Sequence, residues 1–291
     1  MEMRTRVLAI AVLAATGVFV PVASGGAPMG LPTATVGQGQ WAVGAEYGYE
    51  QQDLKAFGRV SEVLLAGSTF SWTQPFRLDS VTSSMFFGTL AYGLCENWDL
   101  FGRIGMSNAK DSLVLLPADT DSLQTQDDLD SSFGLAWGVG TRATFCRSGP
   151  WSFGGLAQVT WFHPGDSSFT VPDPLIPGES WVGDVTLKYW QAQVALAAAY
   201  QADTWRLWAG PFLQFVRGDL DFAGNAVLGG VGVSSLRWTS DLQESSQIGA
   251  QFGANWEITK EWNLLVEGQI TGDSWLVGVG AGFRPGKATD L

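Results

Sequence analysis

Histidine and cysteine are scarce in this sequence of 291 residues, which contains one histidine and two cysteines. The single histidine, His163, leaves little material for catalysis that depends on an imidazole. Basic residues are also few, because 16 lysines and arginines stand against 28 acidic residues, for a net charge of −12. A nucleic-acid-binding protein needs a basic stripe on its surface. The charge balance therefore argues against nucleic acid as a partner.

Long hydrophobic runs are missing as well, apart from one near the beginning. Arg4 and Arg6 precede an apolar run over residues 7–15, and Val22-Ala-Ser24 is a small-residue cleavage site, so we expect an export signal at residues 1–24. The run is shorter than the roughly 20 residues that a spanning helix needs. Yet 46% of the residues are hydrophobic. This combination excludes a helical inner-membrane protein and is typical of a β-barrel, whose hydrophobicity alternates along strands.

Tryptophan is abundant and regularly spaced. Five short polar turns or lead-ins are each followed by a tryptophan and an alternating run, at Trp41, Trp98, Trp151, Trp205 and Trp262. The gaps between them are 57, 53, 54 and 57 residues. A near-constant period of this kind indicates a repeated supersecondary unit, and we interpret the unit as one transmembrane β-hairpin.

The alternation shows which solvent surrounds the strands. Residues 248–258 place bulky apolar side chains at even positions and glycine, glutamine, asparagine and glutamate at odd ones. Side chains of a strand point alternately to opposite faces. In a soluble barrel the bulky set would crowd a narrow interior and leave a glycine-rich exterior. In a membrane barrel, lipid covers the bulky set and the lumen is polar, so we predict a membrane barrel.

The predicted fold is all-β, a single antiparallel up-and-down transmembrane barrel of about ten strands. Residues 25–39 form a periplasmic lead-in, 40–283 the barrel and 284–291 a C-terminal tail. Short periplasmic turns alternate with long segments, which we expect as extracellular loops, at 51–83, 108–131, 163–184 and 218–245. The predicted strands are 40–50, 84–95, 98–107, 132–146, 151–162, 185–200, 205–217, 246–258, 262–271 and 274–283.

Two sets of side chains follow from this arrangement. The membrane-interface girdle comprises the five repeated tryptophans at the short-turn side, with Trp161 and Trp275 at the opposite strand ends. Polar side chains on the inward face should line the lumen: Glu46, Arg103, Arg142, Gln158, Gln191, Gln193, Arg206, Gln251, Asn255, Glu257 and Glu267. Barrels of about eight strands are filled by side chains and those of sixteen or more hold open channels, so a barrel of ten strands is closer to the filled kind. Bulky inward residues such as Phe87, Trp208 and Phe212 also favour a narrow bore.

The cysteines and the loop acids are further candidate sites. Cys95 and Cys146 lie on strands separated by a third, about 9.5 Å apart, which exceeds the roughly 7 Å limit for a disulfide unless the turns bend. Free thiols and a bridge both remain open. The loop acids offer oxygen ligands of the kind calcium prefers, but their spacing departs from a calcium loop, so a solvated, cation-attracting mouth is favoured. They are Asp119, Asp121, Asp127, Asp128 and Asp130, with Asp219 and Asp221. We predict no metal and no cofactor.

The closing strand, 275–283, ends on the aromatic Phe283. It resembles the terminal strand of bacterial outer-membrane β-barrel proteins, except that residues 284–291 follow. The resemblance implies a bacterial outer membrane, its lipid as surroundings and the barrel-assembly machinery as the partner for insertion. Length and strand number are similar to the omptin proteases. His163 has Asp166 near it, and Asp127 and Asp128 precede the adjacent strand, but the adjacent Asp-His pair typical of that family is absent.

Three functions from different classes follow. The first is a narrow porin-like channel for small solutes or ions with an acidic mouth. The alternative is a non-conducting structural or surface-binding barrel that acts through its outer segments on an unknown ligand. A distant alternative is an outer-leaflet hydrolase that uses His163. We expect that the protein is not an enzyme.

Overall fold

The computed structural model describes residues 26–64, 67–115, 125–172, 178–244 and 247–285. No helix in these ranges is long and apolar enough to cross a membrane. Their regular elements are fourteen strands: β1 (Trp41–Leu64), β2 (Thr69–Cys95), β3 (Trp98–Ser107), β4 (Lys110–Leu115), β5 (Thr125–Asp130), β6 (Gly134–Ser148), β7 (Trp151–Phe162), β8 (Ser167–Pro172), β9 (Glu179–Ala202), β10 (Trp205–Leu228), β11 (Val231–Glu244), β12 (Ile248–Glu257), β13 (Trp262–Ile270) and β14 (Ser274–Phe283).

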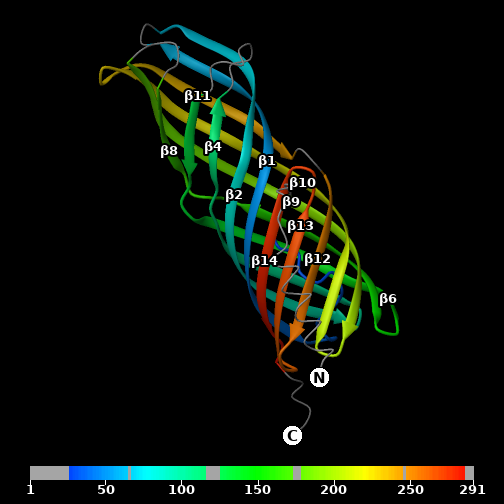
Figure 1. The fold of residues 1–291 in the computed structure, drawn as a ribbon. Helices are drawn as coiled ribbons and strands as arrows, with labels where there is room; N and C mark the ends of the chain where they lie inside the picture. Colours follow the sequence, from blue (N-terminus) through cyan, green and yellow to red (C-terminus); the bar gives the residue numbers. More distant parts are fainter. Residues whose placement is uncertain (1–25, 65–66, 116–124, 173–177, 245–246, 286–291) are drawn as a thin grey trace, which may run out of the picture.

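Ten of these strands close into a ring, which we call the membrane barrel (Figure 1). The order is β1-β2-β3-β6-β7-β9-β10-β12-β13-β14, and every neighbouring pair is antiparallel. The first strand pairs with β2 on one side and with β14 on the other, so the sheet has no free edge there. Closure leaves no open sheet edge exposed to lipid. The prediction of a ten-stranded antiparallel barrel is confirmed.

A second group of strands continues from one end of the membrane barrel around a core of its own, and we call it the extramembrane barrel. Among the described residues no backbone ladder joins two of its strands, β5 and β8. Its eight strands are the upper parts of β1, β2, β9 and β10, together with β4, β5, β8 and β11 (Figure 1). Strand β11 pairs with residues 217–228 of β10 and with residues 54–64 of β1. Between β5 and β8 the backbone N–H of Asp130 donates to Ser167 Oγ at 3.1 Å.

The extramembrane barrel corrects one expectation from the sequence. Segments 51–83, 108–131, 163–184 and 218–245 were expected to be loops, but their described parts are largely strand. Ten strands become eight because the β13–β14 hairpin ends at residues 271–273, whereas its neighbours continue. At this level the Asp53 N–H donates to the Asp273 carbonyl oxygen at 2.9 Å, beside a register shift in β1. The hairpin top therefore marks the boundary between the two barrels.

The face that carries the apolar side chains changes from outward to inward at this boundary. In the lower part of β1 the outward residues include Trp41 and Val43, which are exposed, while Glu50 and Gln52 point inward and are buried. Beyond the register shift, inward Leu54 and Val60 are buried and outward Lys55 and Arg59 are exposed. Apolar side chains leave water for whichever face is dry. The reversal therefore places the upper part of β1 in water and its lower part in lipid.

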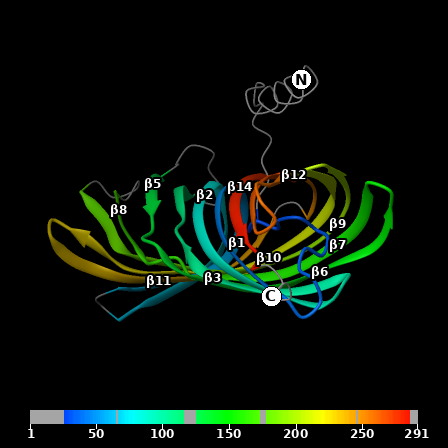
Figure 2. The same ribbon diagram turned by 90° about the horizontal axis from the view of Figure 1, so that it is seen from below.

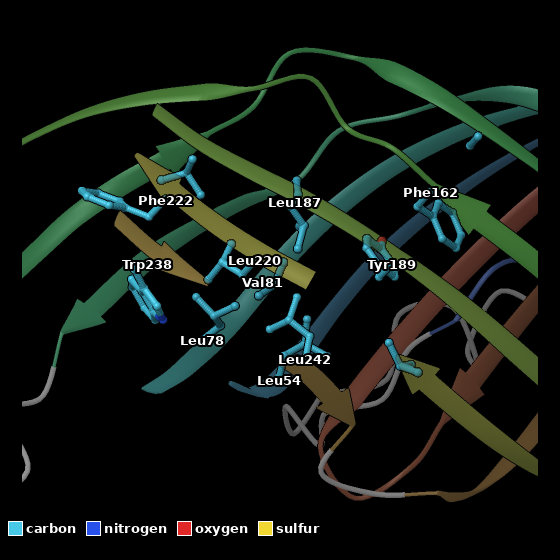
Figure 3. Close-up of a cluster of buried hydrophobic side chains, with 14 of the residues drawn as sticks. Leu54, Leu78, Val81, Phe162, Leu187, Tyr189, Leu220, Phe222, Trp238 and Leu242 are labelled. Atoms are coloured by element: carbon cyan, nitrogen blue, oxygen red, sulfur yellow. The ribbon is translucent and has the colours of Figure 1, made fainter. Parts of the chain in front are cut away.

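Apolar side chains fill the extramembrane barrel and the adjoining end of the membrane barrel (Figure 3). They come from strands far apart in the sequence: Leu54, Val60, Leu78, Val81, Met85, Phe87, Phe162, Phe169, Val185, Leu187, Tyr189, Val216, Leu220, Phe222, Leu236, Trp238 and Leu242. Each is at most 7% exposed. Ring contacts tie the strands together, such as Phe162 stacked on Tyr189 with centroids 4.7 Å apart. The result is a packed core rather than a water-filled passage.

A segment before β1 occupies the lumen of the membrane barrel. Residues 26–36 are buried apart from half-buried Thr35, and Figure 2 shows this blue segment inside the ring of strands. We expected residues 25–39 to be a lead-in on the periplasmic side. The expectation is wrong for residues 26–36, because hydrogen bonds and small side chains let them enter the bore.

Candidate functional site

The inserted segment, residues 26–36, forms a plug that contains no charged side chain. Its backbone N–H and C=O groups are therefore its main polar groups, and burial requires that they find partners. The lumen supplies these partners from the polar side chains of the inward face. The plug is thus specified by the barrel wall as much as by its own sequence.

Three wall residues hold the inner part of the plug. The Glu267 carboxylate accepts from the N–H groups of Met29 at 2.8 Å and Gly30 at 2.6 Å. The Arg103 guanidinium donates to the Pro28 carbonyl oxygen at 2.6 Å, and the Ala27 N–H donates to Gln191 Oε1 at 2.7 Å. Hydrogen bonds that involve a charged group contribute about 1.5–3 kcal/mol each, so Glu267 and Arg103 are the principal anchors.

Asp99 and Arg284 hold the part of the plug near the short turns. Asp99 Oδ2 accepts from the N–H groups of Thr35 at 2.8 Å and Val36 at 3.1 Å, and its other oxygen lies 3.0 Å from Arg142 Nε. The Arg284 guanidinium donates to the Thr35 carbonyl oxygen at 3.1 Å. Asp99 is a site residue that was not predicted, although its place in the alternation of residues 98–106 puts it on the inward face.

Glycines on the wall give the plug its space at two close approaches. A Cβ atom on Gly93 would lie 2.8 Å from the Val36 carbonyl oxygen, and one on Gly154 would lie 2.7 Å from the Pro32 carbonyl oxygen. Only glycine permits a backbone to approach so closely. At these two positions the plug takes the space that a side chain would need.

The predicted lumen residues all lie on the inward face, at two levels of burial. Buried members are Arg103, Gln158, Gln191, Gln193, Gln251, Asn255 and Glu267; half-buried members are Glu46, Arg142, Arg206 and Glu257. The glutamines form a layer around the inner end of the plug, where Gln193 Nε2 donates to Gln269 Oε1 at 3.0 Å and Gln158 Nε2 donates to Gln193 Oε1 at 2.6 Å. Arg103 also donates to the Thr160 hydroxyl.

A second closure lies directly beyond the plug. Ala27, near the inner end of the plug, belongs to the same apolar cluster as Phe87, Met85 and Phe162. This cluster continues into the core of the extramembrane barrel (Figure 3). The plug and the core therefore block the bore in series.

The outside of the membrane barrel is an apolar band with aromatic rings at both edges. Along it many large apolar side chains are exposed, including Ile104, Val139, Leu196, Phe252 and Val266. Trp41, Trp98, Trp151, Trp205 and Trp262 are exposed at the short-turn edge, and Trp161 and Trp275 are half-buried at the other. Cross-strand rings pair at both edges, as in Trp205–Trp256 and Trp137–Trp161. A lipid-facing band, aromatic girdles, short turns at one end and a closed antiparallel ring define a bacterial outer-membrane β-barrel.

A groove of about 720 Å³ lies on the outer face of the extramembrane barrel, next to the upper girdle. Trp161, Trp190 and Phe57 line it together with Lys188, Arg217, Asp219 and Asp241, and His163 stands at its side. Asp166, the potential partner of His163, accepts instead from the Thr186 hydroxyl at 2.7 Å. The side chains of Asp127 and Asp128 lie outside what the structure describes.

Among the described residues the cysteines form no disulfide and the loop acids form no metal site. Cys95 and Cys146 are both free and exposed. Asp130 is paired with Lys110 at 2.9 Å, while Asp119 and Asp121 fall outside the described residues. Among described residues no group of three histidine, cysteine, aspartate or glutamate side chains is arranged to hold a metal ion.

No protein-family model matches the chain, and no curated protein matches it. Solved structures that resemble it include the outer membrane protease OmpT from Escherichia coli, with 9% identity, 84% of this chain and 96% of that chain covered, and a TM-score of 0.43. The outer membrane protein OprG from Pseudomonas aeruginosa has 13% identity over 86% and 97% of the two chains, with a TM-score of 0.40. The translocator domain of the autotransporter NalP from Neisseria meningitidis has 13% identity over 97% and 95%, also at 0.40. Such values identify neither a relative nor an activity.

Proposed function

We propose that this protein is a non-conducting outer-membrane barrel that acts at the cell surface through its extramembrane barrel. The observation that carries the proposal is the pair of closures in series. The plug satisfies its backbone with Glu267, Arg103 and Asp99, and the core beyond it buries side chains such as Phe162 and Leu220 almost completely.

A passive channel for ions or small solutes, the first expectation from the sequence, needs a continuous wet path. A water molecule requires a cavity with polar partners, and the core offers mainly apolar side chains at close packing. Removal of the plug alone would still leave this core in place. The two closures thus favour the surface-binding alternative over the porin-like channel.

The outer face of the extramembrane barrel is where we expect recognition. Its groove combines aromatic surfaces with charges of both signs, namely Lys188, Arg217, Asp219 and Asp241. Recognition usually uses a few polar groups beside apolar surface. The rigid strands beneath would hold such a surface without an ordering cost on binding.

Planar-bilayer recording of the full chain tests the proposal. The wild type and a variant that lacks residues 26–36 should both remain silent, because the core still blocks the bore. Heat-modifiable migration on a gel confirms that each sample contains a closed barrel. Reproducible ohmic steps from the folded wild type would show that the bore conducts and would remove the proposal.

A thiol-labelling experiment provides a second readout. In a background with Cys95→Ser and Cys146→Ser, cysteine placed at Gln193 should resist a charged, membrane-impermeant thiol reagent, because Gln193 is 1% exposed beside the plug. Cysteine at the exposed, outward Lys188 should react readily. Equal labelling at both positions contradicts a sealed lumen.

The hydrolase alternative is tested by assaying the wild type and a His163→Ala variant for lipid or peptide hydrolysis. We expect that neither protein hydrolyses these substrates.

A further inference from the structure

A pocket of about 320 Å³ opens at the short-turn end of the membrane barrel. One side is the wall, with Arg147 and Arg206, and the other side is the plug, with Thr33 and Ala34. The remaining lining consists of Thr144, Gly149, Pro150, Trp151, Ser152 and Gln201. Two arginines and no carboxylate line this pocket, in a chain whose net charge is −12.

The positive charge of this pocket is only partly compensated by its surroundings. Arg206 and Arg284 share one oxygen of Glu257, at 3.9 and 3.5 Å. Arg206 also donates to Gln201 Oε1 at 2.6 Å, which fixes the plane of its guanidinium. Arg147 adds a third cation at the rim. Three guanidiniums against one carboxylate leave a local charge of about +2.

Thr33 supplies an independent indication of a ligand. Its hydroxyl oxygen is buried, with the residue 2% exposed, and has no hydrogen-bond partner among the described residues. A buried hydroxyl without a partner destabilises the folded state, because the hydrogen bonds it loses to water are not replaced. Because Thr33 lines the same pocket as the arginines, a ligand with acceptor oxygens would satisfy the hydroxyl and the charges together.

We propose that this pocket binds a phosphate dianion carried by a small water-soluble molecule that enters from the periplasmic side. A dianion matches the local charge, whereas a carboxylate or the phosphodiester of a phospholipid carries only one negative charge. Guanidinium forks match phosphate oxygens in geometry, and the Thr33 hydroxyl provides a further donor. About 320 Å³ accommodates phosphate with several waters, since a water occupies about 30 Å³. The bound anion would bridge the wall and the plug.

Calorimetric titration of the full chain in non-ionic detergent, with inorganic phosphate at about pH 7.5, tests this site. We expect saturable one-to-one binding that acetate at equal ionic strength does not reproduce. Arg147→Ala and Thr33→Val should each weaken binding by about tenfold. Arg147→Lys should weaken it less, because it keeps the charge and loses the fork. Arg59→Ala, which removes an exposed arginine on the outer face of β1, is the matched control and should bind like the wild type.

Three results would overturn the proposal. Acetate could bind as tightly as phosphate, Arg59→Ala could weaken binding as much as Arg147→Ala, or short-chain phospholipid could compete while phosphate does not. Each variant is first shown to be a folded barrel by heat-modifiable migration, and Arg147→Lys serves if Arg147→Ala does not fold. Because bilayer silence and phosphate binding are measured separately, this site can fail while the proposed function stands, and the reverse also holds.

Discussion

The membrane barrel and the extramembrane barrel share strands but are opposite in chemistry. In the first, leucine, valine and tryptophan face outward and glutamine, arginine and glutamate face inward. In the second, the inward side chains are apolar and the outward ones include Lys55, Arg59 and Lys188. A single strand such as β1 or β10 belongs to the membrane barrel in its one part and to the extramembrane barrel in the other.

The comparison shows that alternation by itself gives two faces, and that the surroundings decide which of them is inside. Burial of apolar side chains stabilises by about 25 cal/mol for each Å² removed from water. In water the only dry place is the interior, whereas within a bilayer the dry surroundings are outside. The position at which the apolar face changes from outward to inward therefore marks the membrane surface along the strand.

The largest effect on stability is expected from a charge placed in the dry interior of the extramembrane barrel. Leu220→Asp buries an unpaired carboxylate at a residue that is 1% exposed, and it should lower the free energy of unfolding by more than about 4 kcal/mol. Denaturant unfolding in lipid vesicles, followed by tryptophan fluorescence, measures the effect. Leu228→Asp on the same strand is 42% exposed and should change it by less than about 0.5 kcal/mol. Equal losses for the two variants would mean that this interior is wet.

The next largest effect comes from the same kind of change on the outward face. Val266→Arg puts a charge on the lipid-facing surface of β13 and should cost about 2–4 kcal/mol if it lies at the bilayer midplane. The reverse change, Lys188→Leu on the outward face of β9, should alter the free energy of unfolding by less than about 0.5 kcal/mol. Both are measured by the same vesicle assay. A tolerated Val266→Arg would contradict the assignment of this face to lipid.

A smaller effect is expected at the polar lumen that only the membrane barrel has. Glu267→Gln removes the charge of the carboxylate that accepts hydrogen bonds from the N–H groups of Met29 and Gly30. This change should weaken the binding of the plug to the wall by about 1.5–3 kcal/mol. Amide hydrogen exchange of residues 26–36 should become about tenfold faster or more. Glu96→Gln, at an exposed turn, is the control. Unchanged exchange in Glu267→Gln would show that other contacts hold the plug.

Much of the membrane barrel could be predicted because its signal is local. The period of the tryptophans and the alternation in residues 248–258 required no knowledge of distant contacts, and all eleven residues predicted for the lumen are buried or half-buried. Strands such as β3, Trp98–Ser107, fall where expected because short polar turns bound them.

The extramembrane strands were missed for the opposite reason. Residues 54–64 and 231–244 carry charges at outward positions and less regular apolar runs, so they resemble solvated loops. They become strands through long-range pairing, with Ser61 opposite both Arg237 and Ser71. Strand propensity depends on such packing neighbours more than on the residue itself.

Sequence alone determined that the chain has two-faced strands in a hairpin repeat, because alternation and turn spacing are properties of neighbouring residues. Only the tertiary structure decided what fills the bore. Residues 26–36 have no charge or periodicity that assigns them to the lumen. They lie there because Glu267 of β13 and Arg103 and Asp99 of β3, two strands far apart in the sequence, satisfy their backbone at the same time. Convergence of this kind depends on ring closure, which no local stretch of the chain specifies.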